Sequence, residues 1–167
     1  IMKKFGVKGL ASSDISGFTI GQRSSQMHIG DIPTFGIMIC YESIFSYEVD
    51  QNILGVDWLI HLTNDAWFGS YSGPQQHLMH SQARAIEQGI TVFRSANTGI
   101  SAVIDQYGRI VHRLDLNTEG YFDANLSKKL ATTIYSGWGA RNWNTLLFSL
   151  IVLMIILCFI KRENKLM

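Results

Sequence analysis

The sequence predicts an α/β domain followed by one apolar helix at its carboxyl end. Two largely apolar runs, residues 35–39 and 57–63, each stop at a polar turn, as buried strands do. A helical pattern that begins at Pro74 separates them from two further strand-like runs on either side of residues 97–99. This order of strands and helices, ending in a strand meander, favours a layered α/β architecture.

The first apolar run leads directly into Cys40, Tyr41 and Glu42. A thiol at the carboxyl end of a strand lies where open α/β sheets carry their reactive groups, and Glu42 follows two residues later. Cys40 is therefore a candidate nucleophile. The alternative is that Cys40 is a small buried hydrophobe, which is the commonest role of an unpaired cysteine. The residues around it leave both interpretations open.

The segment between the first two strands, residues 43–54, has a mixed apolar face that is consistent with a short helix, and Gly55 ends it. The second strand, residues 57–63, closes on a polar turn at residues 64–65. It contains His61. We interpret His61 as a hydrogen-bonded core histidine rather than as a ligand.

A glycine-rich loop after the second strand carries the aromatic residues Trp67 and Phe68. A helix then runs from Pro74 to about Gln88, because proline is favoured in the first turn of a helix. Gly89 is its expected stop.

Two pairs of polar residues lie three positions apart on this helix, and residues at that spacing are neighbours. We interpret Arg84 and Glu87 as an ion pair on the helix face. The other pair, His77 and His80, has no third ligand at a recognisable spacing. We therefore predict no metal site, and we expect no cofactor.

The next two strand-like runs, residues 91–96 and 100–104, flank the turn at residues 97–99. Two such runs joined by a short Asn- and Gly-containing turn predict a hairpin. A second tight turn around Gly108 returns the chain into a strand over residues 110–114.

Residues 143–160 carry no charge and are almost entirely apolar. A helix of this length spans roughly 27 Å, close to the thickness of the hydrocarbon core of a bilayer. Because a soluble core helix rarely stays apolar around its whole circumference, we predict a transmembrane helix here. The basic residues on its two sides nearly balance, and the pair Lys161 and Arg162 mildly favours a cytoplasmic tail. The predicted organisation is a domain over residues 1–142, this helix, and a short basic tail over residues 161–167.

Composition narrows the function classes. The chain has a net charge of +1 and no basic stripe, so nucleic acid is not an expected partner. Its two cysteines, Cys40 and Cys158, lie at a strand end and inside an apolar helix, so we predict no disulfide between them.

Three blocks of the sequence form a recognisable pattern when they are taken together. They are Ile39-Cys40-Tyr41-Glu42, Thr63-Asn64-Asp65-Ala66-Trp67-Phe68-Gly69 and Arg94-Ser95-Ala96-Asn97-Thr98-Gly99-Ile100. The chain resembles the nitrilase, or carbon-nitrogen hydrolase, superfamily in these blocks, and within it the membrane-bound apolipoprotein N-acyltransferase branch. The segment 73–77, the helix around residues 84–87 and the apolar tail strengthen the likeness.

This resemblance implies a four-layer αββα sandwich, of which the chain carries a part, on the periplasmic face of the inner membrane. It also implies a two-step acyl transfer. A phospholipid acyl chain moves to the cysteine sulfur as a thioester and then to the terminal amine of an apolipoprotein. The implied partners are the phospholipid donor, the apolipoprotein acceptor and the membrane itself.

The resemblance also assigns roles to residues. Cys40 matches the nucleophile, Glu42 a glutamate that supports the site, and Tyr41 and Trp67 residues that line it. A thiolate attacks an ester readily, and the thioester can later acylate an amine. The backbone N–H of Tyr41 is expected to help hold the oxyanion. Trp67 and Phe68 suit an acyl chain near a membrane surface.

The family's base glutamate and lysine lie upstream of the cysteine, the lysine farther upstream than the 39 residues available here. Lys3, Lys4 and Lys8 match no motif. We therefore expect the chain to be an incomplete carboxyl-terminal fragment that is inactive alone, with a separate amino-terminal half as a candidate partner.

Two other functions stay open at this point. One is a membrane-tethered, nitrilase-type amidase that hydrolyses a small amide, because a fold alone does not choose the acceptor. The other is a non-catalytic membrane-anchored remnant. The aromatic loop and the apolar tail argue against the amidase, whereas the missing glutamate and lysine support the remnant.

Overall fold

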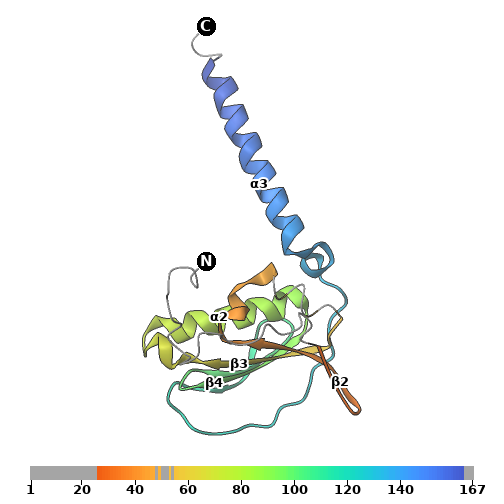
Figure 1. Cartoon of the computed structure of the whole chain (residues 1–167), viewed down its shortest axis with the longest axis vertical. Helices are drawn as coiled ribbons and strands as arrows, with labels where there is room; N and C mark the ends of the chain where they lie inside the picture. Colours follow the sequence, from red (N-terminus) through yellow and green to blue (C-terminus); the bar gives the residue numbers. More distant parts are fainter. Residues whose placement is uncertain (1–25, 48, 50–52, 54, 164–167) are drawn as a thin grey trace, which may run out of the picture.

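The central feature of the computed structural model is a mixed β-sheet, described together with its helices over residues 26–47, 49, 53 and 55–163 (Figure 1). Within these residues, six strands follow one another across the sheet in the order of the sequence. They are β1 (Gln26–Ile29), β2 (Ile32–Ile39), β3 (Trp58–Asn64), β4 (Thr91–Asn97), β5 (Ser101–Ile104) and β6 (Ile110–Leu114).

The three neighbouring strands β2, β3 and β4 run parallel, and β1, β5 and β6 are added antiparallel. A parallel pair needs a crossover connection, and α2 (Ser72–Gln88) supplies it between β3 and β4. α2 lies across one face of the sheet (Figure 1). Gly89 ends α2 in the left-handed conformation, with φ 65°, so the predicted stop is confirmed.

The carboxyl ends of the parallel strands meet along one edge of the sheet. The register places Ile39 beside Leu62 and Asn64 beside Asn97. A short 3-10 helix follows each of the first two parallel strands: η2 (Cys40–Ile44) after β2 and η3 (Asp65–Phe68) after β3. This edge is where α/β sheets bind their ligands.

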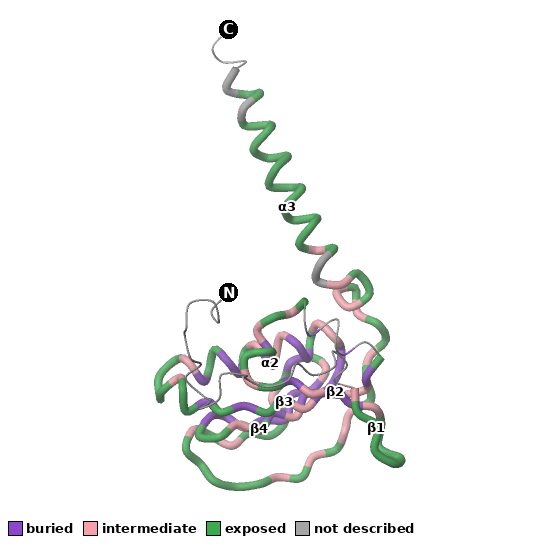
Figure 2. The backbone as a smooth tube through the Cα atoms, viewed as in Figure 1, coloured by how far each residue is buried: buried purple, intermediate pink, exposed green. Residues whose placement is uncertain are grey.

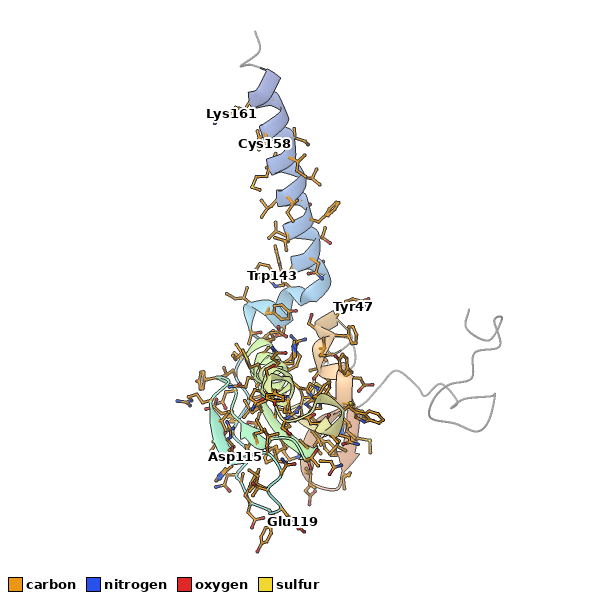
Figure 3. The ribbon with its side chains drawn as sticks, turned by 90° about the vertical axis from the view of Figure 1, so that its left-hand side faces the viewer. Tyr47, Asp115, Glu119, Trp143, Cys158 and Lys161 are labelled. Carbon is orange, nitrogen blue, oxygen red and sulfur yellow. The ribbon has the colours of Figure 1, made fainter. Side chains whose placement is uncertain are left out.

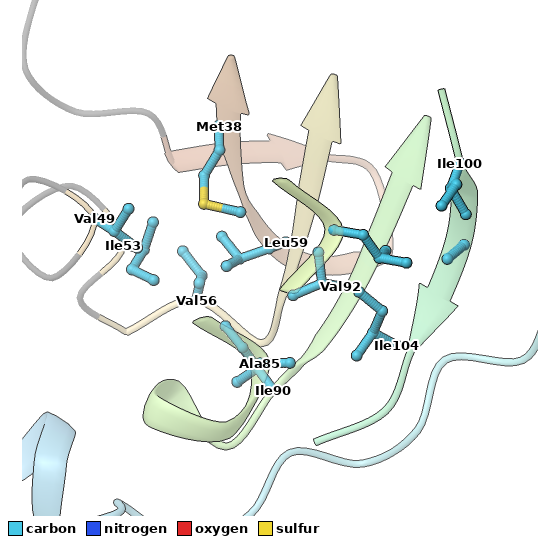
Figure 4. Packing of buried hydrophobic residues seen from close by; sticks show 12 residues of the cluster. Met38, Val49, Ile53, Val56, Leu59, Ala85, Ile90, Val92, Ile100 and Ile104 are labelled. Atoms are coloured by element: carbon cyan, nitrogen blue, oxygen red, sulfur yellow. The ribbon is translucent and has the colours of Figure 1, made fainter. Parts of the chain in front are cut away.

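The apolar core lies between the sheet and α2 (Figures 2 and 4). Leu59, Val92 and Ile104 of the sheet are fully buried, as is Ala85 of α2. The segment between β2 and β3 adds further members of the cluster, which are Val49, Ile53 and Val56. Burial of each large aliphatic side chain stabilises the fold by about 1.5–3 kcal/mol, so this core fixes α2 on the sheet.

The opposite face of the sheet is also apolar. Trp58 and Phe93 pack edge to face there, with 5.3 Å between their ring centroids. Together with Leu114 and Tyr121 they line a cavity of about 680 Å³. The segment after β6 forms the other wall. The described residues hold no second sheet on this face, so they contain a single sheet and a single helical layer of the predicted αββα sandwich.

The predicted helix over residues 143–160 is confirmed as part of α3 (Ile134–Glu163). Gly139 interrupts α3 with a φ of +75°, after which the helix extends away from the domain (Figure 1). Its described apolar residues from Leu146 to Leu157 are exposed to solvent (Figure 2). In the described part of the chain, no helix is both long and apolar enough to cross a membrane, so the predicted transmembrane span is not found.

Most predicted elements are confirmed. β2 to β6 and α2 lie where the strand and helix patterns place them, and Arg84 and Glu87 form the predicted ion pair at 2.8 Å. Both Cys40 and Cys158 are free, as predicted. β1 was not predicted, because its four residues carry little apolar periodicity and become a strand only by pairing with β2.

The helix predicted over residues 43–54 needs a correction at its start. The turn becomes helical already at Cys40, as a 3-10 helix, because the Glu42 side chain bonds back to the backbone before it. Residues 48, 50–52 and 54 lie outside the described residues. So do residues 1–25, which include the three early lysines, and the last four residues of the basic tail.

Candidate active site

Cys40 takes a backbone conformation that few non-glycine residues adopt. It follows the last residue of β2 with a φ of +50°, in the left-handed region. Such a residue is typical of functional sites and costs on the order of 1–3 kcal/mol, so the surroundings must hold it in place. The left-handed residue turns the chain sharply from the strand into η2 and leaves Cys40 half-buried.

Glu42 closes this turn on one side. Its carboxylate oxygen Oε2 accepts a hydrogen bond of 2.6 Å from the backbone N–H of Ile39. The bond spans Cys40, because its two partners lie on either side of that residue in the sequence. A charge-assisted hydrogen bond of this length is among the strong ones, so Glu42 holds the turn that presents the thiol.

Two histidines lie against the turn on its other side. The carbonyl oxygen of Cys40 lies 3.0 Å from Nε2 of His61 on β3 and 3.2 Å from Nε2 of His77 on α2. The hydroxyl of Ser43 lies 3.1 Å from the same nitrogen of His77. The two imidazole rings pack edge to face, with 5.2 Å between their centroids.

Beneath the histidines lies a buried ion pair. Arg94 on β4 donates from Nη2 to Oδ2 of Asp65 across 2.6 Å, and neither side chain reaches solvent. Nδ1 of His77 donates to the other carboxylate oxygen of Asp65 at 2.8 Å. The remaining donors of Arg94 reach the carbonyl oxygen of Ile100, the hydroxyl of Ser81 and Nδ1 of His61. Every charge in this network is therefore paired, as burial requires.

Burial and neighbouring charges set the protonation of this network. Burial, with help from the Arg94 charge, lowers the pKa of His61 to about 3, so that imidazole is neutral at ordinary pH. Burial alone would raise the pKa of Asp65, but the hydrogen bond from His77 and the charge of Arg94 outweigh it and hold that pKa below its usual value. Asp65 is therefore ionised.

Aromatic side chains gather beside the Cys40 turn. Tyr41 and Phe68 lie with 5.7 Å between ring centroids, and Phe68 packs edge to face on His77 at 5.1 Å. These three residues line a small pocket of about 100 Å³. Trp67, in contrast, is 82% exposed on η3.

The structure therefore brings together four of the predicted site residues, Cys40, Glu42, Tyr41 and Phe68, around one turn. Sequence reasoning missed the network beneath them, namely Asp65, His77, Ser81 and Arg94. One signal for it is present: Arg94 stands inside a strand of apolar residues, and a charge in such a strand must find a partner. The interpretation of His61 as a hydrogen-bonded core histidine is confirmed.

Metal binding has no support in this part of the chain. Among the described residues, no group of three or more histidine, cysteine, aspartate and glutamate side chains has an arrangement that could hold a metal ion.

Comparison with known proteins adds a family and a fold. A family model described as carbon-nitrogen hydrolase matches residues 8–135. An apolipoprotein N-acyltransferase of Rhodopseudomonas palustris is 40% identical over 157 residues, which are 94% of this chain and 29% of that protein. One from Agrobacterium fabrum is 36% identical over 167 residues, covering 98% of this chain and 31% of that protein.

Solved structures agree on the fold. Saccharomyces cerevisiae Nit3, a member of branch 10 of the nitrilase superfamily, superposes with a TM-score of 0.52 at 21% identity. The superposition covers 60% of this chain and 40% of that one. The chain spans about three tenths of the length of the N-acyltransferases it matches.

Proposed function

This chain belongs to the carbon-nitrogen hydrolase family, and from that membership we propose that it carries the nucleophile of an acyl-transfer enzyme of lipoprotein maturation. The observation that carries the proposal is the turn at Cys40. A thiol stands at the end of β2 on a left-handed residue, and Glu42 on one side and His61 on the other hold the backbone around it. The names of the relatives support the choice of acyl transfer.

In the first step, the thiolate of Cys40 attacks the carbonyl carbon of a phospholipid ester. A C–S bond forms, the ester C–O bond breaks, and the lysophospholipid leaves as an alcohol after taking up a proton. The negative charge on the tetrahedral oxygen would be met by the backbone N–H of Tyr41, which follows the nucleophile.

In the second step, the free terminal amine of an apolipoprotein attacks the thioester. The C–N bond forms, the C–S bond breaks, and the sulfur leaves as a thiolate while the amine gives up a proton. A thioester suits both steps, because it forms from an ester and still reacts with an amine. The base for these proton transfers would come from the upstream glutamate and lysine that the family resemblance implies.

Tyr41 and Phe68 are the proposed contacts for the acyl chain. Their rings lie together beside the Cys40 turn and line the small pocket described above. Trp67 is mostly exposed on η3, and we propose that it contacts lipid or the incoming acyl chain from outside. Glu42 supports the nucleophile through its bond to Ile39.

We propose that α3 keeps this site at a membrane, which would be the periplasmic face of the inner membrane. Between Leu146 and Leu157 the helix exposes large apolar side chains around its circumference, among them Phe148 with 68% of its surface exposed. An apolar surface of this extent needs a lipid or protein partner. Tyr47 lies at the foot of the helix near Trp143 (Figure 3), and it lines a hollow of about 390 Å³ with Asn144, Thr145 and Phe148.

The experiment uses the full-length protein in vesicles whose phospholipid carries a labelled acyl chain. We expect the label to become attached to the wild-type protein in a form that neutral hydroxylamine releases, as it does a thioester, and to pass to a lipopeptide amine. Cys40→Ala should abolish both. Cys158→Ala is the matched control and should leave both unchanged, because that thiol lies on α3, far from the Cys40 turn.

Two results would contradict the proposal. Labelling and transfer that survive in Cys40→Ala would exclude this thiol as the nucleophile. Release of ammonia from a small amide, without any acylated sulfur from the lipid, would instead identify an amidase.

A further inference from the structure

The peptide group between Cys40 and Tyr41 is held by its oxygen. His61 and His77 contact the Cys40 carbonyl oxygen, and the N–H of Tyr41 is the other end of the same group. A peptide bond is planar and trans, so its C=O and N–H point in opposite directions. A side chain that fixes the direction of the oxygen therefore also fixes the direction of the N–H.

The hydrogen bonds around His61 determine which of its ring nitrogens carries the proton. Nη1 of Arg94 lies 2.9 Å from Nδ1 of His61, and a guanidinium only donates, so Nδ1 accepts. The proton of the neutral ring is then on Nε2. The carbonyl oxygen of Cys40, 3.0 Å away, only accepts, so the same assignment satisfies both bonds.

Arg94 is itself held in place, so it keeps the proton of His61 on Nε2. Its three nitrogens reach Asp65, Ser81 and the backbone of Ile100, and it is buried. Ser81 also lies 2.8 Å from Nδ1 of His61 and can donate to it. If His61 exchanged its donor and acceptor nitrogens, an Nδ1–H would face the Nη1 donor of Arg94, and the Cys40 carbonyl oxygen would face an Nε2 that cannot donate.

We propose that His61 is a positioning residue for acyl transfer: held by Arg94 as the Nε2–H form, it fixes the Cys40 carbonyl and thereby aims the N–H of Tyr41 at the oxyanion. The inference rests on the proposed function, because it needs Cys40 as the nucleophile. It adds a role that the sequence did not predict for His61. His61 touches neither substrate nor sulfur in this scheme.

The test compares two reactions of the same thiol. Acylation by p-nitrophenyl butyrate passes through a tetrahedral oxyanion, whereas alkylation by iodoacetamide does not. In the full-length protein, with modification followed on the peptide that carries Cys40, we expect His61→Leu to slow acylation about 100-fold and alkylation by less than about threefold. His61→Gln keeps an N–H near the position of Nε2 and should restore acylation to within about tenfold of wild type.

Steady-state kinetics of acyl transfer should show a corresponding difference between kcat and KM. His61→Leu should lower kcat for acyl transfer with little change in KM, because substrate binding does not involve this residue. Equal losses in acylation and alkylation would show a general structural defect and overturn the proposal, as would acylation within about twofold of wild type.

A measurement on the unmutated protein covers the case in which His61→Leu does not fold. Imidazole ¹⁵N spectra distinguish a protonated from an unprotonated ring nitrogen, and we expect the proton of His61 on Nε2. A proton on Nδ1 overturns the proposal whatever the variants do. Failure of the proposed function is a separate result, namely retained acyl transfer in Cys40→Ala.

Discussion

Arg94 and Asp65 form an ion pair of 2.6 Å in which no part of either side chain is exposed, although 29 positions separate them in the sequence. The pair joins the start of η3, directly after β3, to the middle of β4, beneath the histidines that lie against the Cys40 turn. A buried charge is tolerated only when it is paired and hydrogen-bonded, so each partner depends on the other. The stability of this pair therefore decides the shape of the nucleophile turn.

Removing one partner of this pair should be costly. We expect Asp65→Ala to lower the free energy of unfolding by about 3–5 kcal/mol, because it leaves the Arg94 charge buried without a counter-charge. Urea unfolding followed by circular dichroism measures this loss of stability. The matched control is Asp115→Ala, which removes the exposed pair with Arg113 and should cost less than about 1 kcal/mol. A loss below about 1 kcal/mol for Asp65→Ala would contradict the assignment.

Acid should destabilise the domain through His61. Burial and then the charge of Arg94 lower the pKa of this imidazole to about 3 in the folded state, while its usual value is 6.5. Between those values the unfolded chain binds a proton that the folded chain does not, so stability falls as the pH is lowered. The slope from this one group is about 1.4 kcal/mol per pH unit.

The measurement is the free energy of unfolding between pH 7 and pH 4 for wild type and His61→Gln. The free energy of unfolding of the variant should change less with pH than that of the wild type, whatever its absolute value. Asp65 contributes to the pH dependence of stability only at lower pH. Its pKa lies below the usual 3.8, so its carboxylate becomes protonated only as the pH falls through that lowered value. Parallel curves for the two proteins above pH 4 would refute the role of His61.

Gly99 lies against the ion pair and cannot carry a side chain. A Cβ at this position would approach Oδ2 of Asp65 to 2.3 Å and its Cβ to 2.5 Å. Gly99→Ala should therefore displace Asp65 and cost about 1–3 kcal/mol, an effect of overpacking. Gly120→Ala is the control, because its Cβ would meet only the flexible end of Leu114 at 3.3 Å. Equal thermal stability of the two variants would count against this explanation.

Glu42 should act through its bond to the backbone of Ile39. Glu42→Ala removes the acceptor and should lower acyl transfer by roughly 10- to 100-fold, because a small displacement of a nucleophile is costly. Glu42→Gln keeps a carbonyl oxygen at the same place and should retain most of the activity. The control is Glu119→Ala, at the end of the domain opposite to α3 (Figure 3). If glutamine fails as badly as alanine, the charge itself is required.

A substitution at Trp67 should change function without changing the stability of the fold. Because it is 82% exposed, Trp67→Ala should change the free energy of unfolding by less than about 0.5 kcal/mol. If Trp67 contacts lipid as proposed, the same change should raise KM for the phospholipid donor. Trp58→Ala is the contrasting variant, since its ring packs between Phe35 and Phe93 and its loss should destabilise the fold. An unchanged KM in Trp67→Ala would remove this residue from the site.

The elements of this domain could be predicted from local patterns. The strand that ends at Cys40, the strand that ends at Asn64 and the helix that stops at Gly89 all follow from apolar runs and from turn residues next to them. Such signals act over a few residues, so they survive without any knowledge of the rest of the chain. Cys40 could be named as a candidate nucleophile for the same reason, whereas the roles of Glu42, Tyr41 and Trp67 were assigned by the family resemblance.

The network beneath the thiol was decided only by the tertiary structure. His61, Asp65, His77 and Arg94 come from β3, the start of η3, α2 and β4, and they meet because the parallel register and the crossover of α2 bring them to one edge. Nothing in the local sequence of a histidine states which nitrogen is protonated or whose carbonyl it contacts. Those facts follow from burial, which makes every unpaired charge costly and so leaves a single consistent arrangement of donors and acceptors.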